Sequence, residues 1–95
     1  MAFCLINLFW SLNQNHFRMW IEENGKLTNC YKFKDFREAI LFINEIAKIC
    51  NEVNHHPEIY NCYNNVKLHL FTHDAQDKIT QKDHQLALLI DKITI

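Results

Sequence analysis

Apolar and polar positions alternate along several short stretches of the chain and follow a helical period along two longer ones. Two extended stretches, about Phe17–Glu23 and Leu27–Phe33, flank the dipeptide Asn24-Gly25. Asn-Gly favours the positive φ angles that a two-residue hairpin turn requires. These residues therefore predict a β-hairpin with its turn at Asn24-Gly25.

A long helix is predicted after this hairpin. Asp35 followed by Glu38 is similar to a capping box, which begins many helices. Pro57 cannot continue a helix and pushes His56 towards an extended backbone, so we expect the helix to end at about Val53. Between these ends, apolar residues recur every three or four positions and predict one buried stripe: Phe36, Ala39, Ile40, Ile43, Ile46, Ala47 and Cys50.

The second half of the chain predicts two more strands and a final helix. Glu58–Cys62 is typical of a short strand, and "YNN" after it of a turn. The next strand alternates between two faces, one with Val66, Leu68, Leu70 and Thr72 and the other with Lys67, His69, Phe71 and His73. Thr80 with Asp83 then begins a helix whose apolar stripe is Leu86, Leu89, Ile90 and Ile93.

This order of elements predicts a single two-layer α+β domain over residues 1–95. The pattern β-β-α-β-β-α favours an antiparallel four-stranded sheet with its helices on one face. The apolar start "MAFCLINLFWSL" lacks the basic region and the cleavage site of a signal peptide, so we interpret it as an N-terminal helix packed on the domain. The small size and the free sheet edges favour association of subunits.

Composition narrows the classes of partner. Apolar residues make up 48% of the chain, charged residues 22%, and the net charge is −1. This balance is typical of soluble globular domains and gives no basic surplus for nucleic acid, while the apolar start is too short to span a membrane. The cysteines have no CxxC spacing, so we expect free thiols rather than a zinc ribbon; they are Cys4, Cys30, Cys50 and Cys62.

Candidate chemistry is concentrated in histidines. His55 and His56 follow the first predicted helix, His73 ends a predicted strand, and Asp83 begins the last helix. In a two-layer fold these ends can meet at one edge of the sheet. Imidazoles exchange protons near neutral pH, with an ordinary pKa of about 6.5. A neutral and a protonated imidazole together suit an elimination of water, which removes one proton and supplies another.

Two other interpretations of the histidines stay open at this point. Three imidazoles with an open fourth position suit zinc, but the side chains of adjacent residues diverge. His69 and His73 do not suit a single zinc ion either, because in a strand they lie about 13 Å apart. The chain has six histidines, and they are also compatible with scattered surface positions that have no joint role.

An ordered set of motifs favours the acid/base interpretation of the histidines over the other two. "NHHPEIYNCYNNVKLHLFTHD" is followed by "ITQKDHQLALLID", and "YKFKDFREA" precedes them. Together these motifs cover about residues 31–91 and resemble the pterin-4a-carbinolamine dehydratase family. The His-His-Pro motif alone is weak evidence, whereas the ordered set is specific.

The resemblance implies a 4a-hydroxytetrahydrobiopterin dehydratase, a hydro-lyase that uses no metal or organic cofactor. Its products are quinonoid dihydropterin and water, formed during recycling of a pterin cofactor. The implied catalytic residues are His55, His56 and His73, of which His55 and His73 do the acid/base work and His56 holds the pterin. The implied substrate-binding residues are His55, His56, Pro57, Thr72, His73, Asp74 and Ala75.

Two positions need separate comment. Asp83 matches an aspartate near the family's pocket, and the resemblance implies a supporting role. It suits capping of the last helix, orientation of a histidine, or both. Asn51 stands where the family often has a glutamate, four residues before His55. Glu52 is one residue late and rotated by about 100° on a helix, which puts an acid/base role of that glutamate in doubt here.

The resemblance also bears on partners. It implies a homodimer or homotetramer in the cytoplasm, or also in the nucleus, without direct contact to nucleic acid or membrane. An alternative function follows from the same family: a non-catalytic oligomeric binding partner, or coactivator, that stabilises the dimerisation element of a transcription factor.

Overall fold

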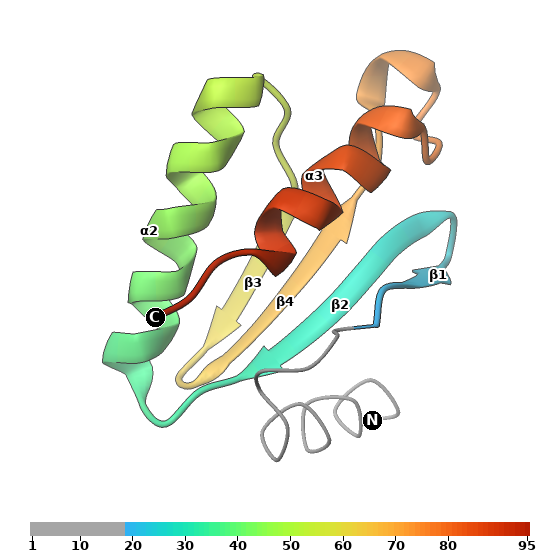
Figure 1. The fold of residues 1–95 in the computed structure, drawn as a ribbon. Helices are drawn as coiled ribbons and strands as arrows, with labels where there is room; N and C mark the ends of the chain where they lie inside the picture. The colour runs from blue at the N-terminus through green and yellow to red at the C-terminus, as the bar shows by residue number, and fades with distance from the viewer. Residues whose placement is uncertain (1–18) are drawn as a thin grey trace.

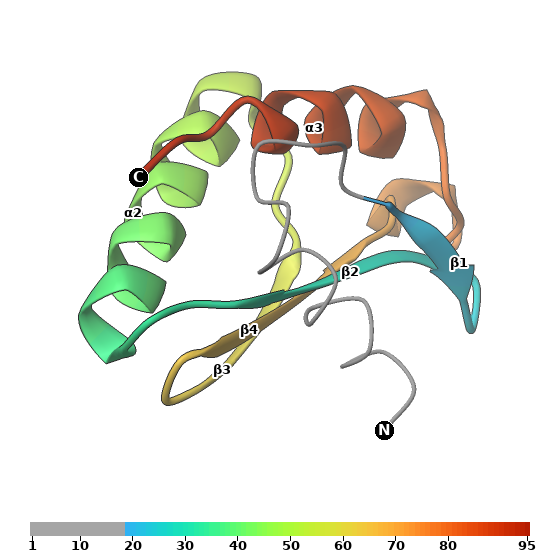
Figure 2. The same ribbon diagram turned by 60° about the horizontal axis from the view of Figure 1, so that its bottom comes forward.

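The computed structural model describes residues 19–95 as a four-stranded antiparallel sheet with two helices on one face (Figure 1). The strands are β1 (Ile21–Glu23), β2 (Lys26–Lys32), β3 (Glu58–Cys62) and β4 (Asn65–Leu70), in the spatial order β1-β2-β4-β3. The helices are α2 (Phe36–Val53) and α3 (Gln81–Asp91), with a 3-10 turn at His73–Ala75. Figure 2 shows both helices above the same sheet face, which confirms the predicted α+β class.

The predicted N-terminal helix lies outside the described residues. No helix within residues 19–95 is long and apolar enough to cross a lipid bilayer.

The Asn-Gly hairpin forms as predicted, but its first strand is shorter. Asn24 and Gly25 have φ angles of 54° and 76°, and Glu23 pairs with Lys26 across the turn. β1 begins at Ile21, so Met19 and Trp20 are not part of it, and residues 17–18 of the predicted strand lie outside the described residues. Before the strand, the Trp20 indole packs against the core and donates its N–H to Asp91 at the end of α3 (3.0 Å).

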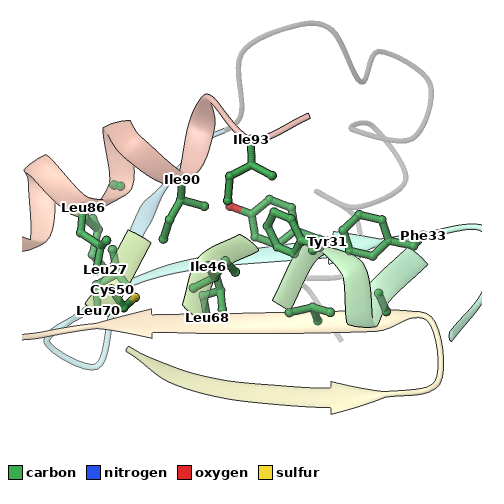
Figure 3. Close-up of a cluster of buried hydrophobic side chains, with 14 residues drawn as sticks. Leu27, Tyr31, Phe33, Ile46, Cys50, Leu68, Leu70, Leu86, Ile90 and Ile93 are labelled. Carbon is green, nitrogen blue, oxygen red and sulfur yellow. The ribbon is translucent and has the colours of Figure 1, made fainter. Parts of the chain in front are cut away.

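The core lies between the sheet and the two helices. Figure 3 shows side chains of α3, such as Leu86 and Ile90, pointing towards Leu68 and Leu70 of β4. The predicted inner face of β4 is confirmed, because its apolar residues are fully buried. The buried cluster consists of Leu27, Tyr31, Phe33, Ala39, Phe42, Ile46, Cys50, Val66, Leu68, Leu70, Leu86, Ala87, Ile90 and Ile93.

The predicted buried stripe of α2 is partly wrong. Phe36 and Ala47 are exposed, whereas Phe42, which the prediction omitted, is 2% exposed and packs 4.6 Å from the ring of Tyr31. Apolar residues occupy two overlapping stripes of this helix, and both have helical spacing. Periodicity alone cannot choose which stripe faces the sheet. The stripe that does so contains Ala39, Phe42, Ile46 and Cys50.

The sheet face opposite the helices carries polar side chains around His69. The Nδ1 atom of His69 lies 2.9 Å from the hydroxyl of Thr28, and the Tyr60 ring meets the imidazole edge-on. Burial lowers the pKa of His69, and the charge of Lys67 lowers it further, while Glu58 on the neighbouring strand acts in the opposite direction.

This lowered pKa predicts a pH dependence of stability. Below the ordinary histidine pKa of about 6.5 the unfolded chain binds a proton that the folded chain binds less readily. The free energy of unfolding should therefore fall as the pH drops through this range, and the fall should be shallower in His69→Gln. Urea unfolding between about pH 7.5 and 5.5 measures both slopes. Equal slopes in the two proteins would contradict the prediction.

Candidate active site

The end of α2 presents His55 and His56. Helix α2 ends at Val53, and Asn54 follows in the left-handed conformation with a φ of 55°. The N–H of His55 still reaches back to the carbonyl of Cys50 (3.2 Å). The predicted helix end at about Val53 is confirmed. The residue that ends the helix is Asn54, three residues before Pro57, because asparagine tolerates this backbone geometry.

His55 is held by a buried carboxylate. Its Nε2 atom lies 2.6 Å from Oδ1 of Asp83, and the exposed fractions of the two side chains are 13% and 0%. Asp83 also accepts the backbone N–H of Thr80 at 2.8 Å, which closes the first turn of α3. Asp83 therefore makes both of the contacts that the sequence suggested for it: it caps a helix and hydrogen-bonds a histidine.

His56 points elsewhere, as expected for adjacent side chains. It is exposed, and its Nε2 atom lies 3.4 Å from Oδ1 of Asn51, which is a long hydrogen bond. Asn51, at the position where the resemblance implies a glutamate, is thus the neighbour of His56. Glu52 is exposed.

His73 begins a 3-10 turn instead of ending a strand. Strand β4 stops at Leu70, and Thr72 is then fixed by an isolated bridge to Lys78. The Nδ1 atom of His73 lies 3.0 Å from Oδ1 of Asp77, but the two side chains are 89% and 59% exposed. Such an exposed pair constrains a side chain only weakly.

The three predicted histidines line one cavity of about 420 Å³. This volume lies within the usual range of small-molecule sites, about 300–1,000 Å³. Figure 1 shows why they meet: the end of α2, the end of β4 and the start of α3 lie at the same end of the sheet. The full lining is Asn54, His55, His56, Phe71, Thr72, His73, Asp74 and Lys82.

The lining differs from the predicted substrate-binding set in a few positions. Pro57 and Ala75 do not line the cavity, whereas Asn54, Phe71 and Lys82 do. The strand pattern had placed Phe71 on the same face as His73, which was an available signal. Lys82 was signalled only by its position next to Asp83. Within residues 19–95, no three histidine, cysteine or carboxylate side chains are grouped so that they could hold a metal ion.

Comparison with known proteins decides the family. The family model for pterin 4 alpha carbinolamine dehydratase matches residues 9–93. The chain belongs to this dehydratase family. A curated relative from Sulfolobus acidocaldarius, provisionally named a pterin-4-alpha-carbinolamine dehydratase, is 43% identical over 74 residues, which are 78% of this chain and 80% of the relative. A Trichormus variabilis protein with the same provisional name is 46% identical over 74 residues, 78% of each chain.

The chain also has the fold of a solved pterin dehydratase structure. The crystal structure of a transcriptional coactivator/pterin dehydratase from Brucella melitensis matches with a TM-score of 0.68 and 32% identity, over 77% of both chains. These comparisons confirm the resemblance that the ordered motifs indicated. They concern the family and the fold, and the roles of individual histidines remain predictions.

Proposed function

We propose that this protein removes water from a 4a-hydroxytetrahydropterin and releases quinonoid dihydropterin, in the recycling of a pterin cofactor. The observation that carries the proposal is the meeting of His55, His56 and His73 around one cavity in a chain of this family. The names of the relatives state the same activity for those proteins.

The different environments of His55 and His73 suggest different roles for them. In the reaction the C4a–O bond breaks, the hydroxyl leaves as water after gaining a proton, and the adjacent ring nitrogen loses its proton. His55, held by Asp83, suits the proton acceptor because its position is fixed. His73 is exposed beside Asp77 and can regain protons from solvent, which suits the donor. His56, which contacts Asn51 instead of Asp83, is assigned to holding the pterin.

A direct assay tests this proposal. The purified protein should accelerate the dehydration of synthetic 4a-hydroxytetrahydropterin, followed by absorbance, above the uncatalysed rate. His84→Ala is a suitable control, because His84 is exposed on α3 and does not line the cavity. A rate equal to the uncatalysed one would refute the proposal.

The name of the Brucella structure also contains a coactivator role. For the present chain, binding to a transcription factor's dimerisation element stays a prediction, as do the homodimer or homotetramer and the cytoplasmic location. Co-purification with a helical dimerisation segment that His55→Ala leaves unchanged would support this second role. The cavity itself favours catalysis, since a purely binding role requires no histidine held by a buried carboxylate.

A further inference from the structure

Two threonines hold the carboxylate that holds His55. Oδ2 of Asp83 accepts the Thr80 backbone N–H and the Thr72 hydroxyl, each at 2.8 Å. The hydroxyls of Thr72 and Thr80 are themselves 2.5 Å apart. Asp83 is 0% exposed and Thr72 is 6% exposed, so this small network is shielded from water. Its members come from the end of β4 and the start of α3.

The directions of these hydrogen bonds can be assigned by counting protons. A backbone N–H only donates, so Oδ2 of Asp83 must accept from Thr80. The single proton of the Thr72 hydroxyl is directed to the same Oδ2, so Thr72 must accept from the Thr80 hydroxyl. Oδ2 thus faces two donors and has no room for a proton. A proton shared by Asp83 and His55 can lie only on the line between Oδ1 and Nε2.

The position of that shared proton follows from ordinary basicity. An imidazole nitrogen is a stronger base than a carboxylate oxygen, so the shared proton belongs on Nε2 of His55. A neutral imidazole that carries its proton on Nε2 has its lone pair on Nδ1. Within residues 19–95, Nδ1 of His55 has no hydrogen-bond partner, and His55 lines the cavity.

We infer that Thr72 is a positioning residue, which acts through Asp83 to fix the Nε2–H tautomer of His55 and thereby presents Nδ1 as the base. The assignment of His55 as base rests on the proposed function, whereas the assignment of the tautomer does not. Thr72 suits this task because it is nearly buried and its own N–H is bonded to the carbonyl of Lys78 (2.9 Å). Removal of its hydroxyl leaves Oδ2 with only the Thr80 N–H as donor.

Three variants test the inference. Thr72→Val keeps the shape of the side chain and removes the hydroxyl, whereas Thr72→Ser keeps the hydroxyl. Thr28→Val is the matched control, because it removes a buried threonine hydroxyl that contacts a different histidine, His69, outside the cavity. We expect kcat for dehydration to fall about 10-fold to 100-fold in Thr72→Val, as for other groups that orient a reacting ligand. KM should change little, and Thr72→Ser and Thr28→Val should retain kcat within about threefold.

The tautomer itself can be read without any activity. Nitrogen-15 NMR of histidine-labelled protein, with the His55 signal assigned by its loss in His55→Gln, distinguishes Nε2–H from Nδ1–H. The wild type should show Nε2–H, and Thr72→Val should show a mixture of tautomers. A wild-type Nδ1–H signal would overturn the inference even if Thr72→Val fails to fold. An unchanged tautomer and an unchanged kcat in folded Thr72→Val would overturn it as well.

The experiments distinguish a failure of the proposed dehydratase reaction from a failure of the proposed positioning role of Thr72. If the wild type shows no dehydratase activity but Thr72→Val still shifts the tautomer, the positioning inference holds and the proposed reaction is wrong.

Discussion

Replacement of His55 by alanine should lower kcat for dehydration by about 10²–10⁴-fold, the usual contribution of a positioned acid or base. Among the contacts within residues 19–95, His55 is the one cavity histidine whose ring is fixed by a buried partner, through the 2.6 Å contact with Asp83. Without the imidazole, the proton of the substrate must pass to water or to a base that is less well positioned. Absorbance kinetics with synthetic 4a-hydroxytetrahydropterin measure kcat and KM separately.

Controls for His55→Ala are available within the chain. His84→Ala removes an exposed imidazole on α3 and should leave kcat unchanged. His56→Ala should raise KM more than it lowers kcat, if His56 mainly holds the pterin. His55→Ala also leaves the Asp83 carboxylate without its histidine partner, so circular dichroism must first show that the variant is folded. A folded His55→Ala with wild-type kcat would remove His55 from the mechanism.

Replacement of Asp83 by asparagine should lower kcat by a comparable factor, about 10²–10⁴-fold, although the shape of the side chain is kept. The Thr80 N–H and the Thr72 hydroxyl both require an acceptor, so the amide oxygen must take the place of Oδ2. The amide NH₂ then points at Nε2 of His55 and donates to it. This forces the proton of the imidazole to Nδ1, where the base should have its lone pair.

The Asp83→Asn experiment has a matched control at the other helix. Asp35 caps α2 through its contact with the N–H of Glu38 (2.9 Å), and Asp35→Asn also exchanges a helix-capping carboxylate for an amide. Asparagine caps a helix about as well as aspartate, so Asp35→Asn should retain both stability and kcat. If Asp83→Asn retains the wild-type kcat while nitrogen-15 NMR shows Nδ1–H, the base must be another residue.

Much of the fold could be predicted from local patterns. The Asn24-Gly25 turn, the alternation along β4 and the capping residues Asp35 and Thr80 each determine a short stretch of backbone by themselves. The predictions that failed concern choices between local solutions. The apolar stripe of α2 could face the sheet in two ways, and the sheet selected the one with Phe42. Similarly, a strand from residue 66 could run to His73, but the bridge between Thr72 and Lys78 turns the chain earlier.

The candidate site was likewise predictable only in part from the sequence. Motif resemblance identified His55, His56, His73 and Asp83 from the sequence, and the structure places the three histidines around one cavity with Asp83 behind His55. The sequence indicated Lys82 in the lining only through its position next to Asp83, and it did not indicate that Asn51 contacts His56. Such contacts depend on how α2 and α3 rotate about their axes, which local patterns leave undetermined.

The sequence by itself determined the elements, their order and the residue types able to move protons, because turns, caps and alternation depend on neighbours along the chain. Only the tertiary structure decided which histidine is anchored. His55 and Asp83 are 28 residues apart, and Thr72 reaches Asp83 across 11. Their contact exists because the packing of α2 and α3 on one sheet brings three chain segments to the same buried point, where a carboxylate must satisfy its hydrogen bonds without water.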